Sequence, residues 1–462
     1  MRKKFVNREA ELSYLESEWK RKGFSLVLIY GRRRIGKTRL LREFTRGKKS
    51  IYYLAVESTI ENINSEFSQI VKQTLGIPVS GEITELIDLV SNVSREKFLI
   101  ILDEVQYIVK ADESFTSKLQ RLIDLNLKEK NIMLILCGSS ISFFKKKLLG
   151  YRSPLFARRT GSIRLHPLVF RDLKGFFPSY SVEDLAMVYG AVGGTPAYLE
   201  KISDSKNFWE NITDIVTPGS YLYDEALNLL RQEVREPRTY LGILKSISEG
   251  KNTNSEIANT SKIDPRTISK YLDVLEELEI IKRVKPLGKK GKSLIDFADN
   301  YFRFWFTFIY RLRSTLEMGQ IGEAVEFIKE NYNKYMGKIF EKIIEELVPT
   351  LYDNKVIKTR PIEFGKWWHK GEEIDIIVRD PGKSTDFIEV KWKTLTSREA
   401  RRELRKLYDK SSKTGLQSKT NNYILIVKKL ADGAPITSHD EGTIVDLRAL
   451  KEIIWRSTKK SN

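Results

Sequence analysis

Eight residues at the end of an apolar run have the types and spacing of a phosphate-binding loop. Gly31–Thr38 reads GRRRIGKT and matches G-x-x-x-x-G-K-[ST], with an apolar run over residues 24–30 before it and a helical pattern after it. The glycines let backbone N–H groups turn inward around phosphates, and the helix N-terminus favours negative charge. We expect Lys37 to reach the β- and γ-phosphates and Thr38 to ligate Mg²⁺. The nucleotide-binding candidates here are Gly31, Ile35, Gly36, Lys37, Thr38 and Arg39.

A second apolar run, FLIILDE over residues 98–104, ends in two carboxylates. Open α/β sheets place their ligands at the carboxyl ends of strands, so Asp103 would hold Mg²⁺ and Glu104 would polarise the attacking water. A third run, residues 132–137, leads into Ser139, whose hydroxyl would lie beside the γ-phosphate. The sequence contains no Asn-Lys-x-Asp signature for reading guanine, so we expect ATP and not GTP.

Arginines downstream of the third run supply a candidate for transition-state stabilisation. Arg152, Arg158 and Arg159 follow a run of three lysines, and Arg158 is our choice for an arginine finger, in cis or in trans. A solvated or polyanion-binding face is the alternative for each of these arginines.

Several short segments together resemble the archaeal ATPase family, a relative of AAA+ and STAND NTPases. These segments are FVNRE at residues 5–9, the LDE and GSS strand ends, and GGTPAYL at residues 193–199. The resemblance covers roughly residues 1–240. It implies that Asn7 and Arg8 lie near the adenine and that the segment ending in Pro196 closes a helical lid over the base. The alternative is that the two elements are a helix cap and a loop break.

Residues 254–278 have the pattern of a helix-turn-helix. Asp264 is expected as the N-cap of the second helix, with Pro265 at its first position. Apolar residues recur along one face of that helix, and its first turns offer polar residues that would enter a major groove. The DNA-reading candidates are Arg266, Thr267 and Lys270.

A basic segment without an acidic residue follows over residues 282–292 and predicts a strand–turn–strand wing. Lys289, Lys290 and Lys292 would contact DNA phosphates from this wing. The alternative is a winged helix used for packing or protein contact.

A third candidate site lies in a predicted hairpin over residues 371–393. Residues i and i+2 of a strand share a face, so Glu389 and Lys391 project together. A turn centred on Gly382 would place Asp375 opposite Glu389, because 382 is midway between them. Two carboxylates at such a short distance repel each other unless a divalent cation lies between them. A site made only of oxygen ligands favours Mg²⁺ or Mn²⁺. Lys391 would orient or help deprotonate a water beside the metal.

This hairpin resembles the PD-(D/E)XK nuclease-like fold, over about residues 335–450. The resemblance implies that Glu341, on the preceding helix, is a further acidic ligand. Ile374 stands where the motif has proline, a departure from the pattern. Two alternatives stay open, namely a paired surface ladder of charges and an inactivated nuclease fold kept for DNA binding.

Composition limits the class of protein. The chain has 462 residues with 41% hydrophobic and 11% aromatic residues, which excludes a disordered chain. One cysteine, Cys137, excludes a disulfide framework and suits a reducing compartment, so we expect a cytoplasmic protein. The formal charge of +19 favours a polyanionic partner, which we take to be DNA and not a membrane surface. A homo-oligomer is left open.

Continuously apolar runs that alternate with helical patterns predict a parallel sheet covered on both faces. The fold class is therefore α/β: a P-loop NTPase sheet with a helical lid, a winged helix-turn-helix and a restriction-endonuclease-like C-terminal domain. We expect a P-loop ATPase core over 1–165, a helical lid over 166–235, a winged helix over 236–295, a helical connector over 296–334 and a nuclease-like domain over 335–462.

Two functions follow from these sites. The first is an ATP-hydrolysing DNA-processing protein that couples DNA binding to Mg²⁺-dependent phosphodiester cleavage. The alternative is a STAND-like ATP-controlled switch or DNA-binding regulator whose nuclease fold is inactive.

Overall fold

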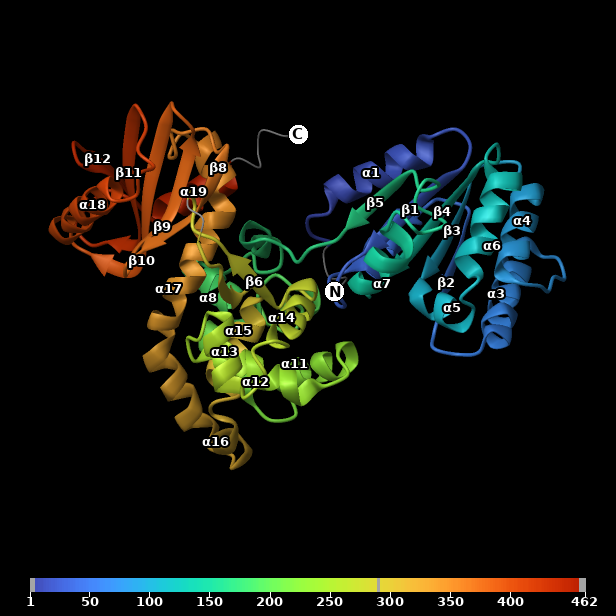
Figure 1. The fold of residues 1–462 in the computed structure, drawn as a ribbon, viewed down its shortest axis with the longest axis horizontal. Coiled ribbons are helices and arrows are strands. Elements are labelled where there is room, and N and C mark those ends of the chain that lie inside the picture. The colour runs from blue at the N-terminus through green and yellow to red at the C-terminus, as the bar shows by residue number, and fades with distance from the viewer. Residues whose placement is uncertain (1–4, 289–290, 457–462) are drawn as a thin grey trace. The chain divides into compact units, whose positions relative to one another are not determined.

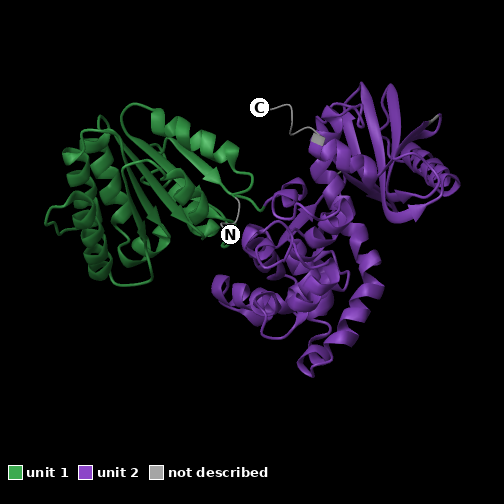
Figure 2. Cartoon of the chain, turned by 180° about the vertical axis from the view of Figure 1, so that it is seen from behind, with its two compact units in different colours: residues 1–167 green, residues 168–462 purple. Residues whose placement is uncertain are grey.

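The computed structural model describes residues 5–288 and 291–456. The chain divides into two compact units, Met1–Pro167 and Leu168–Asn462, which Figure 2 colours separately. Unit 1 ends at Pro167, two residues after the predicted end of the ATPase core at residue 165.

Unit 1 is built on a five-stranded parallel sheet of order β2-β3-β4-β1-β5. Its strands are β1 (Ser25–Tyr30), β2 (Ser50–Leu54), β3 (Phe98–Asp103), β4 (Ile132–Gly138) and β5 (Gly161–Arg164). The central strands are buried along their whole length, as expected for a sheet covered on both faces. The predicted α/β class is confirmed.

Helices cover both faces of this sheet (Figure 1). α1 (Glu9–Lys20) and α2 (Lys37–Phe44) pack on the face that includes Val27 and Ile101. α3 (Ile60–Leu75), α4 (Ile83–Val93), α5 (Val105–Ala111) and α6 (Phe115–Leu122) pack on the face that includes Leu28 and Ile100. The shorter segments of unit 1 are η1 (Ile123–Leu127), α7 (Ile141–Phe143) and η2 (Phe144–Leu149).

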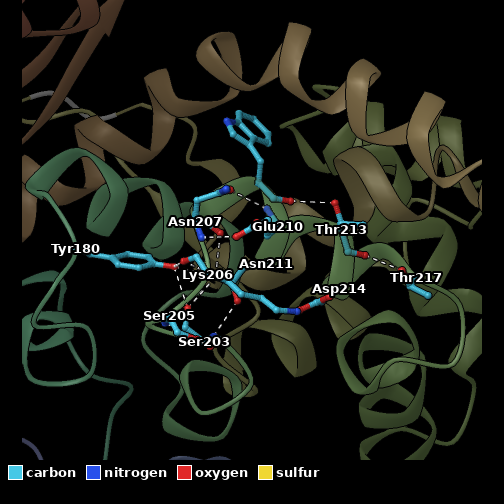
Figure 3. A network of polar contacts seen from close by, with 11 residues as sticks. Tyr180, Ser203, Ser205, Lys206, Asn207, Glu210, Asn211, Thr213, Asp214 and Thr217 are labelled. Atoms are coloured by element: carbon cyan, nitrogen blue, oxygen red, sulfur yellow. Dashed lines mark hydrogen bonds and ion pairs between the residues drawn. The ribbon is translucent and has the colours of Figure 1, made fainter.

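Unit 2 begins with a helical region: η3 (Phe170–Gly175), α8 (Val182–Val192), α9 (Pro196–Leu199), α10 (Phe208–Val216) and α11 (Tyr221–Glu233). A network of hydrogen bonds holds the loop between α9 and α10 (Figure 3). The buried Asn211 amide donates to the Tyr180 hydroxyl at 2.8 Å and to the Ser203 carbonyl at 3.0 Å, and its oxygen accepts from Ser203 N at 2.8 Å. The network satisfies loop groups that would be costly to bury unpaired.

A winged helix follows, as predicted. It comprises α12 (Pro237–Ser248), α13 (Asn254–Ser261), α14 (Ile268–Glu277), β6 (Ile281–Val284) and β7 (Leu294–Phe297), with β6 and β7 antiparallel. The predicted start of the second helix is wrong by three residues, because α14 has Thr267 as its N-cap. The Asp264 carbonyl accepts from Thr267 N at 2.9 Å and Ile268 N at 3.2 Å, which makes a turn of the preceding residues.

The connector contains α15 (Asn300–Phe304), η4 (Trp305–Ile309) and α16 (Arg313–Glu317), and it buries an aromatic stretch against α8 and α12. The 33-residue α17 (Ile321–Asp353) then runs through the predicted domain boundary at residues 334–335. The predicted boundary therefore falls inside one unbroken helix, which would belong to both predicted parts.

The C-terminal part is a six-stranded mixed sheet of order β12-β13-β11-β10-β9-β8. Its strands are β8 (Glu363–His369), β9 (Glu372–Asp380), β10 (Ser384–Leu395), β11 (Thr420–Leu430), β12 (Ile436–His439) and β13 (Gly442–Asp446). α17 and α19 (Leu447–Arg456) pack on one face and α18 (Ser397–Ser412) on the other (Figure 1). Over the described ranges, no helix is long and apolar enough to span a bilayer.

Candidate functional sites

The phosphate loop between β1 and α2 depends on glycine at two positions. Gly31 has φ 153°, and a Cβ there would lie 2.5 Å from Ile35 Cδ1 and 2.5 Å from the Leu165 carbonyl oxygen. Gly36 caps α2 with φ 92°, in the region that side chains disfavour. The loop backbone therefore takes its shape only with these two glycines in place.

Lys37 is held inside this loop. Its side chain is 6% exposed, and Nζ donates to the carbonyls of Gly31 at 2.9 Å and Arg32 at 3.0 Å. Burial lowers the pKa of Lys37, and the nearby carboxylates of Asp103 and Glu104 act in the opposite direction. A buried ammonium held by carbonyl oxygens alone is a suitable partner for a phosphate.

Thr38 and Asp103 meet at the carboxyl end of β3. Thr38 Oγ1 donates to Asp103 Oδ2 at 3.1 Å, and the Tyr52 hydroxyl donates to the same oxygen at 2.5 Å. Burial and the Asp103 carboxylate raise the pKa of Tyr52, so its hydroxyl remains a donor. A hydroxyl and a carboxylate oxygen side by side fit Mg²⁺, which would neutralise phosphate charge when bound.

Glu104 follows with a backbone in the left-handed region, φ 54°. Its Oε2 accepts from Ser139 Oγ at 2.7 Å and Ser139 N at 3.2 Å, and also from the Gln106 amide. The predicted γ-phosphate serine thus lies against the predicted water-polarising carboxylate, and it holds that carboxylate in place.

Arg8 joins the N-terminal segment to the phosphate loop. Its guanidinium donates to the Ile35 carbonyl at 3.3 Å and to the His166 carbonyl at 2.7 Å, and the residue is 9% exposed. Asn7, directly before it, has φ 40°. Arg39 on α2 lies over the Phe5 ring at 6.0 Å. The structure therefore brings Arg8 to the loop; its predicted role at the adenine stays a prediction.

Arg158 lies at the opposite end of the sheet from the phosphate loop. Thr160 N donates to the Leu26 carbonyl near the start of β1, and the loop follows the other end of that strand. Arg158 forms an ion pair with Asp124 at 2.8 Å. An arginine finger acting within the same chain is thus wrong, because the strand length separates Arg158 from the loop; action on a second copy stays a prediction.

Pro196 begins α9 in unit 2, and packing explains the glycines before it. A Cβ on Gly194 would lie 1.7 Å from the Leu168 carbonyl oxygen, and Leu168 N donates to the Gly194 carbonyl at 2.8 Å. The motif is therefore required by a close backbone approach inside unit 2. The closure of Pro196 over a base stays a prediction.

The predicted DNA-reading residues lie together at the start of α14. Arg266, Thr267 and Lys270 are exposed, whereas Ile268 and Leu272 of the same helix are buried. This is the division that a recognition helix needs between groove and core.

The wing makes a second set of contacts. Leu287 N donates to the Lys366 carbonyl at 2.8 Å, and Leu287 packs against a cluster that includes Trp367 and Leu416. Lys292 is exposed, and Lys289 and Lys290 lie outside the described residues. Packing against the C-terminal sheet, one of the two alternatives for the wing, is therefore present.

The predicted carboxylate hairpin has the register expected for a turn at Gly382, since Ile376 pairs with Ile388. Asp375 is the residue directly before Ile376 in β9, and its Oδ2 accepts a hydrogen bond from Val390 N at 2.8 Å. Asp375 is 4% exposed; burial first, then the carboxylates of Glu341 and Glu389, raise its pKa to about 7.

Lysines neutralise the other two carboxylates of this site. Lys391 Nζ lies 2.6 Å from Glu389 Oε1, and Lys410 on α18 lies 3.1 Å from the same oxygen. Lys366 forms an ion pair with Glu341. In the part of the chain that the structure describes, no group of three or more His, Cys, Asp or Glu side chains has the spacing of a metal site.

Comparison with known proteins matches three segments of the chain. Residues 5–202 match an ATPase domain found predominantly in Archaea, residues 238–283 match a bacterial regulatory protein of the arsR family, and residues 305–403 match archaeal and bacterial proteins of unknown function. The uncharacterized protein MJECL04 of Methanocaldococcus jannaschii is 36% identical over 433 residues, which are 92% of this chain and 96% of that protein. The chain belongs to the same family as this protein, and its residues 5–202 are an ATPase domain of the kind found predominantly in Archaea.

Other relatives are more distant. The protein MJ1637 of the same organism is 24% identical over 311 residues, or 61% of this chain and 60% of that protein. The Walker-type ATPase PABY2304 of Pyrococcus abyssi has a TM-score of 0.50 at 20% identity, and the match covers 66% of this chain and 97% of that chain. That similarity supports the P-loop ATPase fold of the matched part of this chain.

Sequence reasoning missed Tyr52, Gln106, Lys366 and Lys410. Only Gln106 is near a motif; Tyr52 is on a neighbouring strand, and Lys410 is 21 residues from its partner Glu389. The sequence offered one indication of the role of Lys410, because this residue lies on the helix that directly follows β10, the strand of Glu389. The others are brought in by packing that no local spacing reveals.

Proposed function

We propose that this protein is an ATPase whose nucleotide state controls its binding to duplex DNA. The observation that carries the proposal is the presence in one chain of a formed phosphate loop and of a winged helix with exposed Arg266, Thr267 and Lys270. Lys37 would bind the phosphates, and Thr38 and Asp103 would hold Mg²⁺. Glu104 would orient the attacking water after its carboxylate releases the hydrogen bond from Ser139. DNA would be bound through the exposed start of α14.

The test measures ATP hydrolysis and duplex binding on the same preparations of the full chain. Lys37→Ala should lose hydrolysis and still bind duplex without nucleotide. Arg266→Ala with Lys270→Ala should weaken duplex binding and keep hydrolysis in the absence of DNA. Wild-type protein whose affinity for duplex is the same with ATP, with ADP and without nucleotide would overturn the proposed control.

A second candidate function is metal-dependent phosphodiester cleavage. The hairpin register favours it, because it sets Asp375 beside Glu389 with Lys391 on the same strand. The lysine pairs on Glu341 and Glu389 favour the switch without cleavage, because the protein's own cations already compensate those carboxylates.

Plasmid, branched and single-stranded DNA with Mg²⁺ or Mn²⁺ distinguish the two functions. If cleavage occurs, Asp375→Asn should abolish it, and Asp380→Asn on the same strand should not. Cleavage that persists in the Asp375→Asn variant would mean that the carboxylate hairpin is not the cleavage site. Absence of cleavage, with no Mn²⁺ binding outside the nucleotide site by calorimetry, would leave the ATP-controlled DNA-binding regulator.

A further inference from the structure

One surface outside the nucleotide site and the winged helix is strongly basic. α18 has an apolar side, comprising Ala400, Leu404, Leu407 and Ser411, that is buried against the C-terminal sheet. Its other side carries cations that are exposed to solvent along most of the helix. The exposed cations of this basic face are Arg398, Arg401, Arg402, Arg405, Lys406 and Lys413, and two exposed carboxylates, Glu399 and Asp409, lie among them.

This arrangement is unfavourable for the helix itself. Arg398 lies in the first turn, where the helix dipole disfavours positive charge, and Arg401 and Arg402 follow in the second turn. Like charges also follow each other at i, i+4, as in Arg398 with Arg402 and Arg401 with Arg405, and such pairs destabilise a helix. Glu399 forms a capping box with Thr396 in the first turn, so the arginines around it exceed the charge that helix capping requires, and a ligand explains this excess better.

Ion pairs inside the protein do not remove this charge. Arg405 lies 2.7 Å from Glu441, yet its side chain is 70% exposed, and Lys413 lies 2.6 Å from Glu372 with 56% exposure. Exposed pairs of this kind contribute little to stability and exchange readily for another anion.

We propose that the basic face of α18 binds the phosphate backbone of duplex DNA. Arginine presents a planar fork that matches phosphate oxygens, and arginines make up the face over its first turns. A membrane surface is a poor fit, because the apolar side of α18 is already buried and cannot enter lipid. The face is about 22 Å long at ~1.5 Å per residue, which corresponds to roughly six base pairs of duplex.

The face also leads to the carboxylate hairpin. Lys410, near the end of the same helix, lies 3.1 and 3.2 Å from the two oxygens of Glu389. The helix that carries the basic face is therefore tied to a carboxylate of the hairpin through Lys410. This inference rests on the proposed function only in taking the same DNA as ligand; it assigns a second contact surface distinct from α14.

The test compares two triple variants of the full chain that remove equal charge. Arg398→Gln, Arg401→Gln and Arg402→Gln change α18, and Lys22→Gln, Lys72→Gln and Arg121→Gln change exposed positions of unit 1. Fluorescence anisotropy with a labelled 30-base-pair duplex at several salt concentrations gives the slope of log K against log salt. The α18 variant should lose about 2.7 from the magnitude of this slope, at ~0.9 per phosphate contact, and the control should lose none.

Two further measurements make the result specific. Replacement of the three arginines by lysine should restore the slope, since the phosphate contacts return. The melting temperature of the glutamine variant should equal or exceed that of wild type, because like-charge repulsion is removed. A lower melting temperature would assign the arginines to stability.

The remaining outcomes also decide the matter. A duplex-binding protein whose slope is unchanged in the α18 variant overturns this inference and leaves the proposed function standing. An equal loss in the unit 1 control would mean that only net charge is measured, which overturns it as well. A wild-type protein that binds no duplex at any salt concentration overturns both.

Discussion

The nucleotide site of unit 1 lies at the carboxyl ends of parallel strands and the carboxylate hairpin of unit 2 lies within two antiparallel strands, and the two sites compensate their charges differently. In unit 1, Lys37 is held by two backbone carbonyls and Glu104 by the Ser139 hydroxyl. In unit 2, Glu389 lies against Lys391 and Lys410. The Lys37 ammonium donates to neutral carbonyl oxygens, whereas the Glu389 carboxylate is paired directly with two ammonium groups.

This difference indicates how each site would respond to a ligand. Neutral partners leave the charge of Lys37 available, so a phosphate adds an ion pair without breaking one. At the hairpin, a cation would first have to displace ammonium groups from the carboxylates, which reduces the net gain. We therefore expect strong dependence on the ligand at the first site and strong dependence on pH at the second.

The largest expected effect is at the phosphate loop. Lys37→Ala should lower ATP hydrolysis at least about a hundredfold, because a buried charge that stabilises the transferring phosphoryl group is lost. Phosphate release measured under saturating ATP checks this. Arg42→Ala, an exposed arginine on the same helix, is the matched control and should hydrolyse at the wild-type rate. Equal rates in both variants would contradict the comparison.

The hairpin should instead respond to pH. Asp375 has its pKa raised from an ordinary value of 3.8 to about 7, so its folded state prefers the proton. Between those two values the folded chain binds more protons than the unfolded chain, and the free energy of unfolding falls as pH rises, with the full loss reached above pH 7. One pKa unit is about 1.4 kcal/mol, so the loss is on the order of a few kcal/mol.

Asp375→Asn should therefore be more stable than wild type at pH 8 and similar to it at pH 4. Denaturant unfolding at several pH values measures this directly. Asp380→Asn, on the same strand, removes an equal charge and should not raise stability at pH 8. If Asp375→Asn gains nothing at pH 8, then its neighbours already compensate the carboxylate.

The sequence predicted the nucleotide site more completely than the hairpin, for a physical reason. Glycine positions, Lys37, Thr38 and the strand-end carboxylates are fixed by the local backbone, so short motifs predict their arrangement. The hairpin register was also predictable, because it depends only on the turn at Gly382.

The partners of these residues were not predictable in the same way. Lys366 and Lys410 reach their carboxylates through the packing of β8 and α18, and Arg158 is carried to the far end of the sheet by the register of β5 on β1. The contact of Leu287 with the C-terminal sheet joins segments about eighty residues apart. No periodicity in one segment encodes such contacts.

The wing contact gives a smaller effect. Gly288 has φ 71°, and a Cβ there would lie 2.3 Å from Leu416 Cδ2, whereas Gly382 has φ 78° and nothing within 4 Å. Gly382→Ala should lower the free energy of unfolding by about 1 kcal/mol through backbone strain alone. Gly288→Ala should cost about 1 kcal/mol more, because Leu416 must also move. Equal losses in denaturant titrations would mean that the wing contact is loose.

The smallest effect concerns Tyr52, which we expect to position the Asp103 carboxylate. Tyr52→Phe removes the hydroxyl that donates to Asp103 Oδ2 at 2.5 Å and leaves the ring in place. Because one net hydrogen bond is worth about 1 kcal/mol, kcat for ATP hydrolysis should fall roughly fivefold, with a higher Mg²⁺ concentration needed for half-maximal rate. Tyr53→Phe is the matched control, since its hydroxyl donates to Glu66 at 3.0 Å on the neighbouring helix α3. A Mg²⁺ requirement unchanged in Tyr52→Phe would mean that Thr38 and the Glu104 backbone N–H are enough to orient the Asp103 carboxylate, and the phosphate loop would then depend on fewer supporting contacts than the structure indicates.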